Sequence, residues 1–302
     1  MPDKYLTLKE IQNLEFYILK EFAKFCEEHK LFYMLTYGTL LGAKRPPDQP
    51  KLLHVHPKTA QNYNVLGAKR HNGFIPWDDD IDVMMPRDDY EKFVLLVKRL
   101  NNLDRIELLD SSQNEYFYPF AKLCLKNTVA EQEDSKAIHG VWLDIFPIDK
   151  VPADRIKRIL FHKKLIFCRA LIISYNTDFK TMKNDWKWFV KYVLAIISGL
   201  IGCKRITRYA EREAKKYNNT DSNLYSAVVW QISSKGNISE KNLKIKIKEK
   251  FENELFNIPL GYDEYLKELY GDYMQLPPID KRKNHYLKVY YKKNEVSGYT
   301  KF

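Results

Sequence analysis

The spacing of the apolar positions along this chain distinguishes predicted helices from predicted strands. From residue 6 to residue 29 apolar residues recur every three or four positions, which predicts one long amphipathic helix. An apolar and aromatic run over 31–35 predicts a short strand, and it ends at Gly38-Thr39, a pair that permits a tight turn into a second helix. A helix is also predicted over 87–100. Further strands are predicted over 80–85, 106–109, 118–125 and 140–146.

Beyond Pro152 the pattern becomes mainly helical and the positive charge increases. The helical periods cover 155–175, 183–217, 243–251 and 262–270. We therefore expect an α+β fold in two parts. Residues 1–150 form a core with a small mixed sheet and flanking helices, and residues 151–302 form a mainly helical region that packs on this core and completes its cleft.

The pentapeptide LGAKR occurs twice, at 41–45 and at 66–70. The stretch between the copies has three prolines within five residues and no apolar period, which predicts a loop inserted over 46–70. Either copy could enter the second helix. The continuity with the strand at 31–35 favours the first.

Four aspartates occupy five positions within an otherwise apolar segment. On a strand, Asp78, Asp80 and Asp82 share one face because side chains alternate, whereas Asp79 points to the other face. Such a cluster is costly without a cation. Carboxylates suit Mg²⁺ or Mn²⁺, and Mg²⁺ usually adds water and substrate phosphate to one or two of them. The segment predicts a metal–phosphate site; the alternative is a solvated acidic turn.

Asp144 lies alone in the apolar strand 141–146, where an unpaired charge is expensive. If this strand runs beside that of Asp80 and Asp82, Asp144 completes a three-carboxylate metal site and can orient or deprotonate an attacking hydroxyl. A structural hydrogen-bonding role is the alternative. We expect Asp144→Ala to abolish activity and Asp149→Ala to be tolerated far better.

The composition narrows the class of protein. The 302 residues are 45% hydrophobic and 29% charged, which excludes disorder as the dominant state, and the net charge of +11 favours an anionic partner. The lysines are spread over helices and tails without a recognised nucleic-acid module, so we expect no nucleic-acid partner. Four well-separated cysteines and a charged start without an apolar leader predict a reduced, cytoplasmic protein.

The most apolar segment, 189–203, covers roughly 22 Å as a helix, which is short of a bilayer core of about 30 Å. We expect this helix to pack in the protein core. The alternative is a peripheral membrane contact, with Trp186 and Trp188 at one end of an interfacial helix and Lys204 and Arg205 at the other.

The segment 37–45, resumed at Arg70-His71 and continued to Tyr90, resembles the signature of the LicD family of phosphocholine transferases, to which fukutin and fukutin-related protein are related. The family pattern runs without interruption, and removing 46–70 restores it as GTLLGAKRHNGFIPWDDDID. Further matches are Lys122 with Thr128, GVWLDIFPID at 140–149, and YGDYMQLPP at 270–278 followed by Lys281-Arg282. The order of elements resembles the nucleotidyltransferase fold of the polymerase-beta type.

The resemblance implies a reaction and a set of site residues. A phosphorylated alcohol, usually phosphocholine, moves from its CDP-activated form to a sugar hydroxyl of a cell-surface glycan, teichoic-acid, lipopolysaccharide or lipid-linked glycan precursor, and CMP leaves. A catalytic Mg²⁺ or Mn²⁺ is held by Asp80, Asp82 and Asp144. The implied substrate-binding residues are Gly38, Thr39, Arg70, His71, Asp78, Lys122 and Arg282.

Residue chemistry agrees with several of these roles. Gly38 lets the backbone approach phosphate closely, and Thr39 offers a hydroxyl and an N–H at a helix N-terminus. Lys122 is a point charge for the diphosphate; a surface lysine with a buried stem is the alternative. Two other functions stay open: transfer of NMP from an NTP to a small hydroxyl compound, and non-catalytic binding at a membrane surface.

Overall fold

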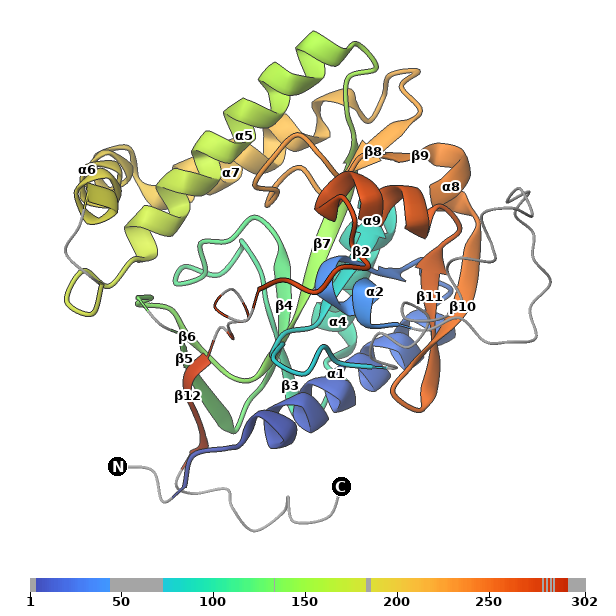
Figure 1. The fold of residues 1–302 in the computed structure, drawn as a ribbon. Coiled ribbons are helices and arrows are strands. Elements are labelled where there is room, and N and C mark those ends of the chain that lie inside the picture. Colours follow the sequence, from blue (N-terminus) through green and yellow to red (C-terminus); the bar gives the residue numbers. More distant parts are fainter. Residues whose placement is uncertain are drawn as a thin grey trace.

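The computed structural model describes residues 4–43, 73–132, 134–182, 186–278, 280, 282, 284 and 286–292 (Figure 1). It is a mixed α+β structure around a sheet in the order β1-β2-β7-β4-β3. Strand β7 also pairs with β8, which in turn pairs with β9. Strands β2 and β7 are parallel, and the other pairs of this sheet are antiparallel. The strands are β1 (Met34–Leu35), β2 (Asp82–Pro86), β3 (Ile106–Leu109), β4 (Ala121–Leu125), β7 (Trp142–Lys150), β8 (Leu224–Ser226) and β9 (Ile238–Ser239).

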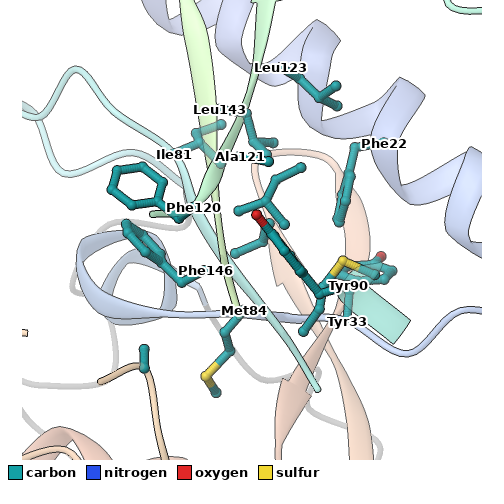
Figure 2. Close-up of a cluster of buried hydrophobic side chains, with 14 of the residues drawn as sticks. Phe22, Tyr33, Ile81, Met84, Tyr90, Phe120, Ala121, Leu123, Leu143 and Phe146 are labelled. Carbon is teal, nitrogen blue, oxygen red and sulfur yellow. The ribbon is translucent and has the colours of Figure 1, made fainter. Parts of the chain in front are cut away.

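Helices α1 (Leu8–Glu28) and α4 (Arg87–Leu100) pack together beneath one face of this sheet. Helix α1 begins at a capping box, in which Thr7 and Glu10 bind each other's backbone N–H. The rings of Phe22 and Phe93 meet edge to face with centroids 5.2 Å apart. Figure 2 shows Phe22 close to Leu123 and Leu143 of the sheet. The period predicted for these two helices therefore reflects the core that they bury.

The opposite face of the sheet is the one that builds the site. Side chains alternate along β4 and β7, so Lys122, Asp144 and Phe146 point away from Leu123 and Leu143. Helix α5 (Arg155–Asn176) stands over this second face with α6 (Trp186–Ile201) and α7 (Cys203–Ala214) (Figure 1). The other helices are α2 (Tyr37–Gly42), α8 (Glu240–Lys244), α9 (Tyr262–Tyr270) and the 3₁₀ turn η1 (Lys215–Tyr217).

The second half of the chain contributes strands as well as helices. Strand β8 joins the main sheet, and β12 (Tyr286–Tyr291) pairs with β5 (Thr128–Gln132), which also pairs with β6 (Ile138–His139). A hairpin of β10 (Lys246–Phe251) and β11 (Glu254–Pro259) contacts β1 and α1. The two predicted parts are thus joined through shared sheets, and their division at residue 150 stays a prediction.

One of the helical predictions in this half is wrong. The segment 243–251 ends helix α8 and then forms β10, where lysines alternate with other residues as a strand requires. The helical pattern of 183–217 is confirmed from residue 186 onward, and it forms separate helices. Gly202, with φ of +91°, separates α6 from α7.

The prediction that 189–203 packs in the core is also wrong. Within α6 the buried side chain is Ser198, while Leu200 is 82% and Phe189 is 64% exposed. The helix packs through Ser198 and the half-buried Leu194 and Ala195, and its apolar stripe points outward. The helices that the structure describes include none long and apolar enough to cross a membrane.

The residues that flank the predicted insert lie next to each other. The N–H of Gly73 donates to the carbonyl oxygen of Gly42 at 3.1 Å, and a Cβ on Gly42 would lie 2.1 Å from the oxygen of Gly73. The first LGAKR copy begins inside α2, as expected. The insert 46–70, the second copy, Arg70 and His71 lie outside the described residues.

Deleting residues 46–70 should stabilise the protein by about 1–2 kcal/mol. The deletion shortens the connection between Ala43 and Gly73 about sevenfold, and each halving of a loop lowers its closure entropy by about 0.6 kcal/mol. Urea denaturation of the two chains measures the difference. Loss of soluble protein on deletion would show that the segment belongs to the core.

Candidate active site

Three of the predicted aspartates line one cavity of about 600 Å³. Asp82 begins β2 and pairs in register with Asp144 of the parallel strand β7, so both side chains emerge from the same sheet face. Asp80 precedes β2 and lines the same cavity, whereas Asp79 is fully buried and does not line it. The structure thus brings Asp80, Asp82 and Asp144 to one cavity, while their roles in metal binding and catalysis stay predictions.

Charge around Asp82 is strongly negative. Burial, followed by the charges of Asp80, Asp144 and Asp78, raises the pKa of Asp82 well above its usual range, and Lys122 acts in the opposite direction. The exposed fraction of Asp82 is 8%. Ionisation of this carboxyl therefore depends on nearby positive charge.

Lys122 is a buried member of the site and not a surface lysine. It lies on β4 opposite Asp144 in the register, and its ammonium forms an ion pair with the Asp144 carboxylate. The Nζ atom also lies 4.5 Å from the centroid of the Trp142 ring. The structure thus places Lys122 where a diphosphate beside the aspartates would meet it.

The donor set fits a divalent cation, although the side chains are not preformed around one. Among the described residues, no three His, Cys, Asp or Glu side chains are arranged to hold a metal ion as they stand. Asp144 is engaged with Lys122, while Asp80 and Asp82 face the cavity. Neighbouring carboxylates raise the pKa of Asp82, so a bound cation would favour its ionised form. Carboxylate oxygens are also the ligands that Mg²⁺ and Mn²⁺ prefer.

Helix α2 supports the aspartates. The N–H of Asp82 donates to Oγ1 of Thr39 at 2.8 Å, which ties the start of β2 to the helix. A Cβ on Gly38 would lie 2.6 Å from Oδ2 of Asp78, so a larger residue would displace that carboxylate. Tyr37 has φ of +46°, a strained conformation for a non-glycine residue, and its ring lines the cavity. Gly38 and Thr39 thus position aspartates, and their contact with substrate stays a prediction.

Comparison with known proteins identifies a family domain in this chain and a relative along most of its length. The family described as LicD/FKTN/FKRP, nucleotidyltransferase domain, matches residues 61–179. Over 295 residues the chain is 28% identical to the lipopolysaccharide cholinephosphotransferase LicD of Haemophilus influenzae. The aligned residues cover 95% of this chain and 99% of that protein. The chain contains a LicD-family domain. The predicted resemblance is therefore confirmed.

The LicD family match includes the aspartates, Lys122 and the second LGAKR copy at 66–70, and it begins after Gly38 and Thr39. The structure nevertheless places the start of the first copy in α2, the same helix whose Gly38 and Thr39 lie against Asp78 and Asp82.

Arg282, the last predicted substrate-binding residue of the LicD signature, lies against Trp77. Its guanidinium carbon is 4.7 Å from the centroid of that ring, and its Nε donates to the carbonyl oxygen of Pro277 at 2.9 Å. Trp77 directly precedes Asp78, so the contact joins the C-terminal segment to the aspartate segment. Arg282 is not among the residues that line the cavity with Asp82.

Arg169 of α5 is a site residue that the sequence analysis missed. It lines the cavity with Asp80 and Asp82, and its guanidinium lies 4.9 Å from the centroid of the Trp230 ring. Its Nε is buried and has no hydrogen-bond partner among the described residues. Burial lowers the pKa of Arg169. The signal that could have revealed it is a lone arginine in the apolar run 165–173.

A second cavity, of about 1030 Å³, adjoins the first. The two share Tyr118 and Asn176 in their walls. The second is walled largely by aromatic and apolar side chains, including Tyr116, Tyr175 and Ile196. The candidate site therefore extends over two adjoining cavities.

Proposed function

We propose that this LicD-family enzyme transfers phosphocholine from CDP-choline to a sugar hydroxyl of a cell-surface glycan or lipopolysaccharide precursor and releases CMP. The observation that carries the proposal is the convergence of Asp80, Asp82 and Asp144 with Lys122 and Arg169 around one cavity. The named activity of the Haemophilus influenzae relative, lipopolysaccharide cholinephosphotransferase, supports the choice of group and acceptor.

We further propose that the central sheet is a polymerase-beta-like nucleotidyltransferase core that binds Mg²⁺ or Mn²⁺. Asp80, Asp82 and Asp144 would hold the ion, which would offset negative charge on the diphosphate. The parallel pair β2–β7, which carries two of these aspartates at paired positions, supports this assignment.

The protein's own groups account for the remaining steps. Asp144 orients the sugar hydroxyl and accepts its proton as the hydroxyl oxygen bonds to the phosphorus of phosphocholine. The bond from that phosphorus to the CMP oxygen breaks, and CMP leaves with the bonding electrons. Lys122 and Arg169, both in the cavity wall, counter the charge on the leaving phosphate. Arg70, His71, Gly38, Thr39, Asp78 and Arg282 remain proposed substrate-binding residues through the family signature.

The aromatic wall of the first cavity favours choline over ethanolamine, glycerol or ribitol. The ring centroid of Trp230 lies 5.1 Å from that of Tyr118 and 5.0 Å from that of Phe120, and Phe120 lies 4.7 Å from Phe146. All four side chains line the cavity. Clustered aromatic rings attract a quaternary ammonium through their negative faces.

Product identification tests the reaction. Purified protein with Mg²⁺ and lipopolysaccharide is incubated separately with CDP-choline, CTP and ATP. We expect CMP from CDP-choline together with choline bound to the acceptor. Pyrophosphate from CTP or ATP would instead support nucleotidyl transfer, and no product would support a binding protein.

Arg169→Gln should lower kcat/KM for CDP-choline by about 10- to 100-fold, because a hydrogen bond to a charged group is worth about 1.5–3 kcal/mol. Lys163→Gln, which removes an exposed cation from the same helix, is the matched control and should leave the rate unchanged. Steady-state kinetics and a melting curve are measured for both. An unchanged kcat/KM in Arg169→Gln would remove Arg169 from the site.

A further inference from the structure

Helix α6 presents a broad apolar stripe to solvent. Nine of its apolar side chains are at least 36% exposed, and they are Trp186, Phe189, Val190, Tyr192, Val193, Ile196, Ile197, Leu200 and Ile201. They recur every three or four residues and so share one side of the helix. Ser198 on the opposite side is fully buried. An exposed apolar surface of this kind marks a contact with something outside the chain.

The charge around α6 is complementary to an anionic surface. Residues 186–210 contain no Asp or Glu, and Lys187, Arg205 and Arg208 of this stretch are exposed. Lys204 is not part of this set, because its ammonium donates to backbone oxygens of Ser111 and Tyr116 and anchors α7 to the core. Trp186, 70% exposed at the start of α6, is a residue type enriched at membrane interfaces.

A second copy of the chain fits this stripe less well. Half the surface of a helix of this length, about 24 Å long and 10 Å wide, offers about 400 Å², against about 800 Å² per partner in a stable interface. The helix is also not long and apolar enough to cross a bilayer. An amphipathic helix with basic flanks can instead lie in the interfacial plane of a membrane.

We propose that α6 docks the protein on an anionic membrane surface, with its apolar stripe among the lipid chains. The helix also borders both cavities: Lys191 lines the one that holds the aspartates, and Ile196 lines the neighbouring one. Docking through α6 therefore brings the second cavity beside the bilayer, where a lipid-linked acceptor would be presented. Only this last step rests on the proposed function.

Vesicle binding tests the docking without any turnover. The full chain is sedimented with vesicles of phosphatidylcholine and phosphatidylglycerol, and with vesicles of phosphatidylcholine alone. We expect binding to the anionic vesicles that falls at high salt, and at least tenfold weaker binding of the double variant Phe189→Ser with Leu200→Ser, because each side chain loses buried apolar area. Leu95→Ser, which alters a 65% exposed leucine on α4, should bind like the wild type.

Two further measurements guard the interpretation. Melting curves should be unchanged in both variants because the altered side chains are exposed. Gel filtration without lipid should give the same size for the wild type and the double variant. Failure of the wild type to bind anionic vesicles, undiminished binding by the double variant, or a dimer that the double variant dissociates would each overturn the proposal.

Discussion

Asp82→Asn should lower the rate of phosphocholine transfer by about a thousandfold and, at the same time, raise the melting temperature of the metal-free protein. The rate falls because the variant loses a carboxylate proposed to hold the cation that offsets the negative charge of the diphosphate. The stability rises because burial and the charges of Asp80, Asp144 and Asp78 oppose ionisation of Asp82. A carboxyl whose pKa is raised on folding stabilises the fold below its unfolded pKa, and this contribution is lost as pH rises through the folded pKa. At neutral pH the uncharged amide of the variant therefore removes the free-energy cost that Asp82 imposes on folding.

Mg²⁺ gives this prediction a second, independent readout. Added Mg²⁺ should raise the melting temperature of the wild type, because a ligand that binds only the native state stabilises it, and should do so much less in Asp82→Asn and Asp80→Asn. Asp88→Asn is the matched control, since Asp88 is exposed on the first turn of α4 close in sequence to the site. Wild-type turnover in Asp82→Asn would remove the assignment of the aspartates.

The parts of this structure that burial determines locally could be predicted from the sequence. The periods of α1 and α4 follow the core that Phe22 and Phe93 fill, so they mark the helices and their inner faces. The pairing of Asp82 with Asp144 was predictable for the same reason, because a lone acid in an apolar strand requires a polar neighbour.

What covers a surface could not be predicted in this way. The pattern of α6 identifies its apolar stripe, but periodicity does not say whether protein or another phase lies against it. The structure turns Ser198 inward and leaves the stripe exposed. Arg169 was missed because its place in the cavity depends on where α5 crosses the sheet, a tertiary relation that no local pattern contains. The strand β10 was missed because Lys and Glu, residue types that favour helices, occupy four of its six positions.

Asp149 is another residue whose role depends on a tertiary contact that the local sequence pattern does not contain, and it has the largest expected effect on stability. From its place beyond Pro147 at the exit of its strand, Asp149 was expected to tolerate alanine far better than Asp144 does. That expectation for activity stays a prediction, but it did not include the burial of Asp149 that the structure shows. Asp149 is fully buried and accepts two hydrogen bonds from Arg87, at 2.8 Å from Nε and 2.5 Å from Nη2. Asn218 adds a third, at 2.7 Å from its Nδ2.

Asp149→Ala should therefore destabilise the protein by about 3–5 kcal/mol, because it leaves the buried guanidinium of Arg87 without a counter-ion. Urea denaturation measures the loss. Asp144→Asn, on the same strand, should instead abolish transfer with a smaller loss of stability, because the nearby Asp82 carboxyl still offsets the charge of Lys122.

A double variant distinguishes loss of the pair from exposure of one charge. If the cost of Asp149→Ala comes from the unpaired Arg87, then Arg87→Met combined with Asp149→Leu should recover most of the lost stability, because two apolar side chains of similar volume replace two buried charges. The Arg87→Met change alone should cost about as much as Asp149→Ala, since it leaves the carboxylate buried with only Asn218 to hold it. Additive losses in the double variant would mean that packing around β7, and not charge pairing, determines the stability contributed by this end of the strand.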